Sequence, residues 1–477
     1  MFCTTSKRTL RLGTTWLLVL CCAAWPHAAH GQPAESPQAT STVARAMTLP
    51  DALAYARAHQ PLIRAGLARV AARIDEASVP SAQWLPRVGI TGQVVGGTVN
   101  NTTASYLTTD TMGIPRIGGT SAASASSWKP YPSTLVGAGI RQEAFDFGRI
   151  SAQRAAADAL VEVQKEQASV TLLDVEFAVE EAYFAVFAAK GVLSASEDAY
   201  ARAKVHRDLA KGGVASGLRS PIELTRAEAE LARYDIGRIR ATGGVAIAQS
   251  VLAAAIGAPE ASVDVAGDSP RPAEMPSLAE AIRRAAIRDP RVRQALAQIR
   301  ASEERTRAVG AELRPDVSLT TTFTGRAGGA PPSGATASTL TGDGWLPYVP
   351  NWDVGLVVQW PIFDGTVVAR REASRAGEAV ARDDLDVARQ EQVAAIERTH
   401  TFFDVASRAL PGLEQAVTAA RANYEQADAR FRAGLGTAVE LADAEDLRAS
   451  AEINLALGQF DVARARAAFG RAIAEGL

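Results

Sequence analysis

The residues of this chain that could carry out catalysis do not fall into any of the spacings that mark common enzymes. The sequence contains no Walker A loop, HExxH helix, GxSxG elbow or Rossmann glycine fingerprint. Beyond the first segment the histidines are His59, His206 and His400, which are too widely separated in the repeat described below to suggest a shared metal site. We therefore expect no enzyme, no cofactor and no metal.

The N-terminal segment has the pattern of a secretory signal peptide. Lys7, Arg8 and Arg11 precede the apolar run TTWLLVLCCAAW, and Ala29-His30-Gly31 provides the small residues that a signal peptidase requires. We expect cleavage after Gly31, so that residues 1–31 are the signal peptide and residues 32–46 a linker. No later run of about 20 apolar residues is evident, so no further membrane-spanning helix is expected.

All three cysteines, Cys3, Cys21 and Cys22, lie in this N-terminal segment. The mature chain is therefore expected to contain neither a disulfide nor a reactive thiol. In a lipoprotein, Cys21 or Cys22 would be acylated, but Leu20 stands before Cys21 where a small residue is expected. This alternative is disfavoured and stays open.

The composition favours long helices over one large compact core. The chain has 477 residues, only 6% aromatic residues and a formal net charge of -2, which gives no reason to expect a nucleic-acid partner. Residues 149–211 contain no proline and hardly any glycine, which predicts a continuous helix of about 95 Å. Residues 367–433 repeat this pattern, with a predicted break near Pro411-Gly412. Such lengths are typical of a coiled coil or a helical tube.

The chain contains the same unit twice. An offset of 229 residues carries Pro61 onto Pro290 and Pro86 onto Pro315, without a gap. Each copy begins with a predicted capping box, at Thr48-x-x-Asp51 and at Ser277-x-x-Glu280. Each copy is predicted to run through helix, strand, loop, strand, long helix, tip and helix. We place the first repeat at residues 47–260, a linker at 261–274 and the second repeat at 275–477.

Four short segments alternate between apolar and polar residues and are predicted to be strands, at about 87–96, 135–145, 316–325 and 352–363. In the last segment Trp352, Val354 and Leu356 share one face, while Asp353 and Gly355 share the other. Two interpretations fit this alternation: a half-buried antiparallel sheet of a soluble domain, and a transmembrane β-barrel.

The positions of the aromatic residues favour the barrel. Aromatic side chains cluster near both ends of the predicted strands, as in the two interfacial girdles of a membrane barrel. One cluster is Trp84, Phe145, Trp360 and Phe363, and the other is Trp128, Tyr131, Trp345, Tyr348 and Trp352. Four strands cannot close around a usable hole, so several chains would have to pool their strands.

The duplicated unit, its two Phe-Asp strand-to-helix turns and the signal peptide together resemble the outer membrane efflux protein (TolC) family, over about Met47 to Ala474. The resemblance implies a mainly α fold with a small β part, assembled as a homotrimer. Its twelve strands would form one outer-membrane β-barrel, continued by a long α-helical barrel in the periplasm. Members are passive exit ducts in the outer membrane that serve tripartite efflux or type I secretion. The implied partners are a periplasmic adaptor (membrane fusion) protein, an inner-membrane transporter of RND or ABC type, and outer-membrane lipid.

The resemblance assigns roles to the strand-to-helix turns. Phe145, Asp146 and Gly148 in the first copy, and Phe363, Asp364 and Gly365 in the second, would lie where a membrane strand becomes a tunnel helix. An aspartate there can cap the new helix, and Gly365 can take backbone angles closed to other residues.

The resemblance also assigns roles to the tips of the two helical hairpins. Ala433, Gly434 and Leu435 match the motif with which the family's tips meet the adaptor, and Gly212, Gly213 and Val214 are a poorer match in the first tip. The alternative is that these glycines only end helices and turn the chain.

Just after the second tip, Glu440 and Asp443 match positions where the family narrows its tunnel with acidic rings. Three copies of each would attract cations. The alternative is an ordinary solvated first turn whose acidic residues suit the helix dipole. Gly436 stands where the family's gate has an arginine, so that latch is not expected here.

Two questions stay open at the level of the sequence. A soluble periplasmic coiled-coil scaffold would explain the helices and the signal peptide, although it would not explain alternating strands with aromatic girdles. The sequence also does not separate drug or metal efflux from type I protein secretion.

Overall fold

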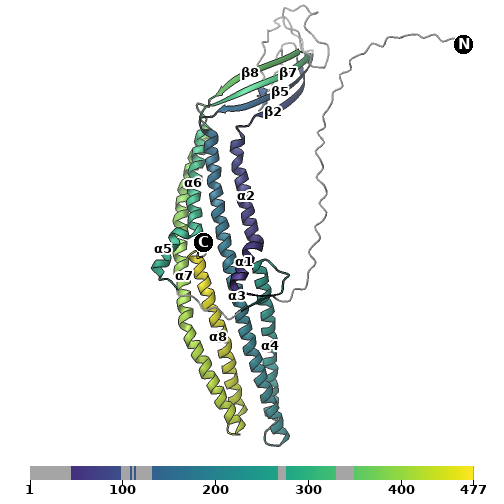
Figure 1. Ribbon diagram of the computed structural model, residues 1–477, viewed down its shortest axis with the longest axis vertical. Coiled ribbons are helices and arrows are strands. Elements are labelled where there is room, and N and C mark those ends of the chain that lie inside the picture. Colours follow the sequence, from purple (N-terminus) through teal and green to yellow (C-terminus); the bar gives the residue numbers. More distant parts are fainter. Residues whose placement is uncertain are drawn as a thin grey trace, which may run out of the picture. The chain divides into compact units, whose positions relative to one another are not determined.

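The computed structural model describes residues 45–97, 108–109, 112–113, 131–266, 275–328 and 349–475 (Figure 1). The predicted signal peptide, its cysteines and nearly all of the following linker lie outside these residues. Residues Ala44–Leu477 form one compact unit.

The order of elements in this unit is the same in both halves of the chain. The first half contains α1 (Leu49–His59), α2 (Pro61–Ala82), β2 (Arg87–Gly97), β5 (Tyr131–Phe145), α3 (Arg149–Ala215) and α4 (Pro221–Ile256). The second half contains α5 (Leu278–Arg288), α6 (Pro290–Ala311), β7 (Asp316–Gly328), β8 (Val349–Gln359), α7 (Gly365–Arg432) and α8 (Ala438–Ala472). The duplicated helix-strand-strand-helix fold, mainly α with a small β part, is thereby confirmed.

Two short strand pairs and two helix caps complete the described part of the unit. β1 (Arg45–Met47) pairs in parallel with β6 (Val263–Val265), and β3 (Thr108–Thr109) pairs with β4 (Met112–Gly113). The capping box at Thr48 forms as expected, with both reciprocal contacts to Asp51. At Ser277 the hydroxyl accepts from the Glu280 amide, while the Glu280 carboxylate pairs with arginines one turn later.

Several boundaries differ from the sequence-based expectation. β5 begins at Tyr131 and β8 at Val349, both earlier than expected, and β7 extends to Gly328. β8 ends at Gln359 and does not reach Phe363, because Pro361 lacks the amide that a ladder needs and Asp364 already caps the next helix. α7 continues through Pro411 without the predicted break. The neighbouring helix stabilises it there, since the Leu413 side chain packs where a Cβ on Gly458 of α8 would stand.

The four long strands form one antiparallel sheet in the order β2-β5-β7-β8. Its two faces differ sharply in character. On one face Ile90 is 80% exposed and Leu356 is 66% exposed, whereas Thr322 on the other face is 1% exposed. Thr322 contacts Asp353 of β8 on that polar face. A solvated soluble sheet would expose its polar face, so the alternation favours a lipid-facing apolar surface.

One of the two aromatic clusters is described by the structure and is exposed. Trp84 is 39% exposed, Phe145 54%, Trp360 61% and Phe363 81%. In the other cluster Trp352 is exposed, while Trp128, Trp345, Tyr348 and the Tyr131 side chain lie outside the described part.

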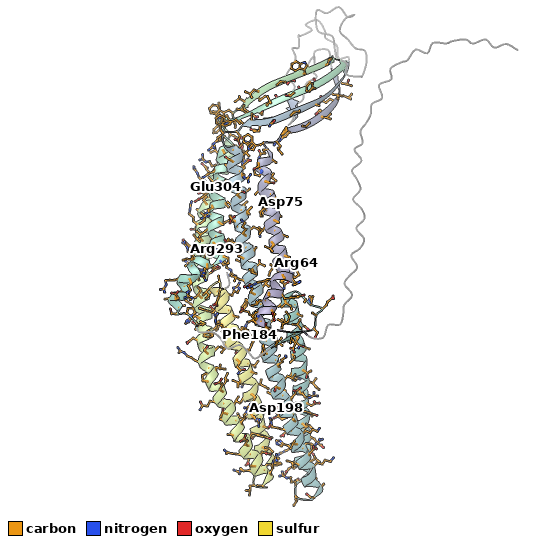
Figure 2. The ribbon with its side chains drawn as sticks, in the orientation of Figure 1. Arg64, Asp75, Phe184, Asp198, Arg293 and Glu304 are labelled. Atoms are coloured by element: carbon orange, nitrogen blue, oxygen red, sulfur yellow. The ribbon has the colours of Figure 1, made fainter. Side chains whose placement is uncertain are left out.

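The helices form two rows that share α3 and α7 (Figure 1). Next to the sheet, α3 packs between α2 and α6, and α6 packs on α7 (Figure 2). Toward the hairpin tips, α3 packs between α4 and α8, and α8 packs on α7. Where α1, α3 and α4 meet, Tyr183 is buried and donates to the carbonyls of Met47 and Ala266, which joins the β1–β6 pair to α3.

α4 is more apolar than the sequence reading allowed. It contains an 18-residue window of mean hydropathy 1.5, long and apolar enough by length and composition to cross a membrane. Glycine and polar residues, among them the adjacent Gln249 and Ser250, interrupt the apolar residues of α4, so the search for an unbroken apolar run missed it. One such helix is weak evidence of a span, and only 17% of the window is buried within the chain.

Candidate functional site

The first strand-to-helix turn depends on two consecutive residues whose backbone has the left-handed conformation, with positive φ. The buried Asp146 carboxylate accepts from the amides of Gly148 and Ile150. Phe147 has φ 51° and Gly148 has φ 88°, and the Arg314 guanidinium donates to the Phe147 carbonyl at 2.8 Å. Asp146 thereby satisfies the first amides of α3, and Gly148 supplies a conformation that is costly for other residues.

The second turn has simpler geometry. Asp364 is the N-cap residue of α7, and its carboxylate accepts from the amides of Thr366 at 2.8 Å and Val367 at 3.4 Å. Hydrogen bonds from Thr366 hold the pKa of the Asp364 carboxyl below its usual value. The bond from the Thr366 hydroxyl has the larger effect, and the bond from its backbone amide adds to it. Gly365 is the first residue of the helix and does not have a positive φ, so the expected use of its backbone freedom is wrong.

The two hairpin tips are built alike, but not from the residues that the sequence indicated in the first tip. Gly212, Gly213 and Val214 lie inside the last turn of α3. The reversal is made instead by Gly217, with φ 73°, which is followed by Leu218 at 83% exposure.

The second tip has the same arrangement. Ala433 ends α7, Gly434 has φ 75°, and Leu435 is 76% exposed. The Leu218 amide donates to the Gly213 carbonyl, and the Leu435 amide donates to the Arg430 carbonyl, both at 2.9 Å. Each tip is therefore a glycine C-cap that presents one exposed leucine. In the sequence, the matching tripeptides are Ser216-Gly217-Leu218 in the first tip and Ala433-Gly434-Leu435 in the second. The first was overlooked because the glycine pair Gly212-Gly213 stands just before it.

Glu440 and Asp443 lie on the exposed side of the first turns of α8. The Thr437 hydroxyl accepts from the Glu440 amide at 3.2 Å, so Thr437 caps this helix. The Glu440 carboxylate lies 3.9 Å from the Arg430 guanidinium, near the end of α7. Burial raises the pKa of the Glu230 carboxyl on α4; the nearby Arg233 opposes this shift, and the Asp443 carboxylate adds to it.

An arginine that the sequence reading missed joins the two tips. Arg219 of the first tip donates to the Phe431 carbonyl at 2.9 Å, and its guanidinium lies 3.7 Å from the centre of the Phe431 ring. The same guanidinium pairs with Glu223 at 2.9 Å. Its stem passes over Gly213, where a Cβ would come within 2.6 Å of the arginine Cδ. This combination of cation–π, hydrogen-bond and ionic contacts links the start of α4 to the end of α7.

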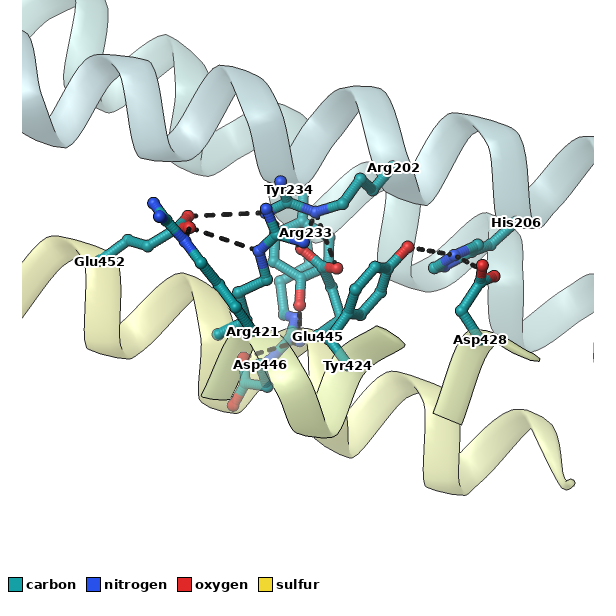
Figure 3. Close-up of polar contacts among 11 residues, drawn as sticks. Arg202, His206, Arg233, Tyr234, Arg421, Tyr424, Asp428, Glu445, Asp446 and Glu452 are labelled. Atoms are coloured by element: carbon teal, nitrogen blue, oxygen red, sulfur yellow. Dashed lines mark hydrogen bonds and ion pairs between the residues drawn. The ribbon is translucent and has the colours of Figure 1, made fainter. Parts of the chain in front are cut away.

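Farther from the tips, polar side chains, most of them buried or half-buried, line the contact between α3 and the α7–α8 hairpin (Figure 3). We call this set the polar seam: Arg202 and His206 of α3, Arg421, Tyr424 and Asp428 of α7, and Glu445, Arg448 and Glu452 of α8. Arg202 Nε donates to both oxygens of Glu445 at 2.9 Å. Burial raises the pKa of Glu445 and raises that of Tyr424 to about 12. The residues of the polar seam lie too far apart in the sequence for their spacing to reveal that they are in contact.

Among the described residues, no group of three His, Cys, Asp or Glu side chains could hold a metal ion. His206 contacts Tyr424 and lies near Asp428. The features that stand out are therefore an exposed apolar sheet face, two capped strand-to-helix turns and two matched tips. These features define a membrane channel whose strands lead directly into long helices.

The sequence profile of the family described as "Outer membrane efflux protein" matches residues 52–258 and 281–475. The chain belongs to this family, one of channels and not of enzymes, and it is an outer-membrane protein that extends into the periplasm. No curated protein matches the sequence.

Solved structures with the same fold include several outer-membrane channels. The outer-membrane channel OprN has 21% sequence identity and a TM-score of 0.69, and the match covers 90% of each chain. VceC of Vibrio cholerae has 17% identity and a TM-score of 0.66, over 89% of this chain and 95% of that one. The open state of MtrE of Neisseria gonorrhoeae has 18% identity and a TM-score of 0.65, over 90% of this chain and 89% of that one.

Proposed function

We propose that the chain is one protomer of a homotrimeric exit duct. Three copies contribute twelve strands to one outer-membrane barrel, and their helices continue it as a periplasmic tube. The duct passes substrates that an inner-membrane pump delivers, and it contributes no chemistry of its own.

The observation that carries this proposal is that the sheet and both rows of helices are open, each with two different edges that have no neighbour within the described chain. The sheet runs β2-β5-β7-β8, the helices beside it run α2-α3-α6-α7, and those near the tips run α4-α3-α8-α7. Among the described elements, the same two edges therefore recur at every level, β2, α2 and α4 on one side and β8 and α7 on the other. Unlike edges of this kind associate head to tail and can close into a ring.

The exposed aliphatic side chains of the edge helices support this assembly. They include Leu62 and Ile74 on α2, Ile236 and Ile247 on α4, and Val380 and Val387 on α7. Each is at least half exposed in the single chain, and burial against a neighbouring copy would remove this apolar area from water.

Disulfide crosslinking between edges tests the ring. Because the mature chain is expected to lack cysteine, Ile90→Cys on β2 can be combined with each of Trp352→Cys, Val354→Cys and Leu356→Cys on β8. Oxidation of native membranes should give ladders that end at three chains. The matched control, Ile90→Cys alone, should give no ladder. If none of the three pairs forms a crosslink and the extracted protein has the mass of a monomer, the result would contradict the ring. It would favour the alternative of a soluble periplasmic coiled-coil scaffold.

We further propose that both tips dock with a periplasmic adaptor protein that connects the duct to an RND or ABC transporter. The proposal is supported by the matching geometry of the two tips, in which Leu218 and Leu435 each follow a left-handed glycine and are exposed. Efflux and type I secretion both use this arrangement, and identification of the co-purifying transporter separates them. Glu440 and Asp443 are proposed to line the mouth beside the second tip.

The chain division is part of the same proposal. The two segments matched by the family profile support repeats at 47–260 and 275–477, joined by a linker at 261–274. Residues 1–31 would be removed on export, which sequencing of the mature N-terminus would test.

A further inference from the structure

His206 is a titratable group placed inside a helix contact of the polar seam. Its side chain is 8% exposed, and its Nε2 lies 3.0 Å from the Tyr424 hydroxyl and 3.8 Å from Asp428 Oδ1 (Figure 3). The residue comes nine positions before Ala215, the end of α3, and so lies about 14 Å from the tip.

The carboxylates around His206 already have arginine partners, so their charge is largely balanced before the imidazole gains a proton. On α7, Asp428 Oδ2 pairs with Arg432 at 2.8 Å, while Asp428 Oδ1 has no hydrogen-bond partner and lies 3.8 Å from His206 Nε2. On α3 itself, Arg202 lies one turn away and is engaged by Glu445. The other charged groups of the seam are likewise paired: Glu452 of α8 with Arg421 and Arg448, and Arg233 of α4 with Asp446 of α8.

We propose that His206 makes the contact between α3 and the α7–α8 hairpin acid-labile, so that acidification of the periplasm loosens the seam and favours an open duct end. The proposal adds regulation to the duct proposed above and rests on it for the consequence at the tips. Its structural part, a seam that loosens in acid, does not depend on transport.

The direction follows from linkage between protonation and packing. Burial, opposed by Asp428 and aided by Arg432 and Arg202, lowers the pKa of His206 from its ordinary value. The closed seam therefore binds fewer protons than an open seam with hydrated His206. Closure is favoured fully above the ordinary histidine pKa of about 6.5 and is progressively lost as the pH falls to the lowered value. Each unit of lowering changes the closed-to-open ratio about tenfold.

Spin-label distances on the detergent-purified mature protein, which is expected to lack native cysteine, test this directly. Val205→Cys on α3 and Gln426→Cys on α7 place labels on exposed positions of the two helices that His206 separates. We expect the population of longer distances to grow between pH 7.5 and pH 5.5. In a His206→Gln background this response should be lost, because glutamine keeps a polar contact with Tyr424 and does not titrate.

Two further variants separate His206 from general acid effects. His400→Gln, at a half-buried histidine elsewhere on α7, should leave the response intact. Arg432→Gln keeps His206 but frees Asp428 to pair with the protonated ring, so the acid response should disappear.

An acid response that persists in His206→Gln, an absent response in the parent, or shorter distances in acid would each overturn the inference. The last result would mean that protonated His206 tightens the seam through Asp428. Because the labels report helix separation whether or not the protein conducts, failure of the duct proposal would not be mistaken for failure of this one.

Discussion

At the scale of residues, the two strand-to-helix turns solve one problem by different means. Both use an aspartate to satisfy the first amides of a very long helix. Only the first adds a left-handed Phe147-Gly148 pair, secured by Arg314 from the second repeat. The two glycines that look equivalent in the sequence, Gly148 and Gly365, therefore differ in what they contribute.

Substitution of these glycines should separate them. Gly148→Ala forces a side chain into φ 88° and should cost about 1–2 kcal/mol. Gly365→Ala is the matched control and should change stability little, because its Cβ would lie 3.9 Å from the Phe363 ring, an ordinary contact. Thermal unfolding of the purified assembly measures both. Equal loss in the two variants would show that the turns are not distinguished by backbone conformation.

The acidic pair beside the second tip has a charge-based prediction. Replacing Glu440 and Asp443 together with alanine should lower the cation-to-anion permeability ratio of single channels, because each copy of the chain loses two negative charges at the mouth. Reversal potentials in a salt gradient measure this ratio. Asp208→Ala, at an exposed site on α3, is the control that should leave it unchanged. Unchanged selectivity in the double variant would reduce these residues to a solvated first turn.

At the scale of elements, the sequence predicted the order of helices and strands well, because the repeat superimposes on proline positions and the strand periodicity is strict. It failed where local composition misleads. The sequence placed the first tip at Gly212-Gly213 and overlooked Gly217. The prediction failed because an α-helix tolerates glycine in its last turn. Pro411 suggested a break that packing of Leu413 on α8 overrides. The polar seam and the Arg219 link join residues about 200 positions or more apart, which no local pattern encodes.

The tips yield a paired prediction. Leu218→Glu and Leu435→Glu should each abolish transport while leaving the oligomeric mass unchanged, because each removes the most exposed apolar side chain of its tip. Substrate accumulation in cells, with mass measured on the extracted protein, provides the test. Leu209→Glu, partly exposed on α3 away from the turn, should retain transport. Normal transport in both tip variants would remove adaptor docking from these residues.

The sheet faces yield another paired prediction. Leu356→Arg on the apolar face of β8 should hinder membrane assembly by about 2–4 kcal/mol, if this position lies near the bilayer midplane. Val357→Arg is the matched control, since the next residue points to the polar face. Assembly is measured as the heat-resistant fraction of the membrane protein on a gel. Normal assembly of Leu356→Arg with failure of Val357→Arg would invert the assigned orientation.

At the scale of the whole molecule, the two repeats lay a sheet and two rows of helices side by side with the same edges exposed at each level. The family match and the solved channels share this fold. Under the proposed function, the chain completes its barrel and its tube only by association with further copies. The length of α3, 67 residues or about 100 Å, suits a tube that spans the periplasm.

Planar-bilayer recording on the detergent-purified mature protein, with the oligomeric mass determined on the same sample, tests this account most directly. We predict a mass of three chains and discrete pores that prefer cations. A monomer that is released without detergent and gives no conductance would contradict the account, because it would mean that the strands never cross a membrane.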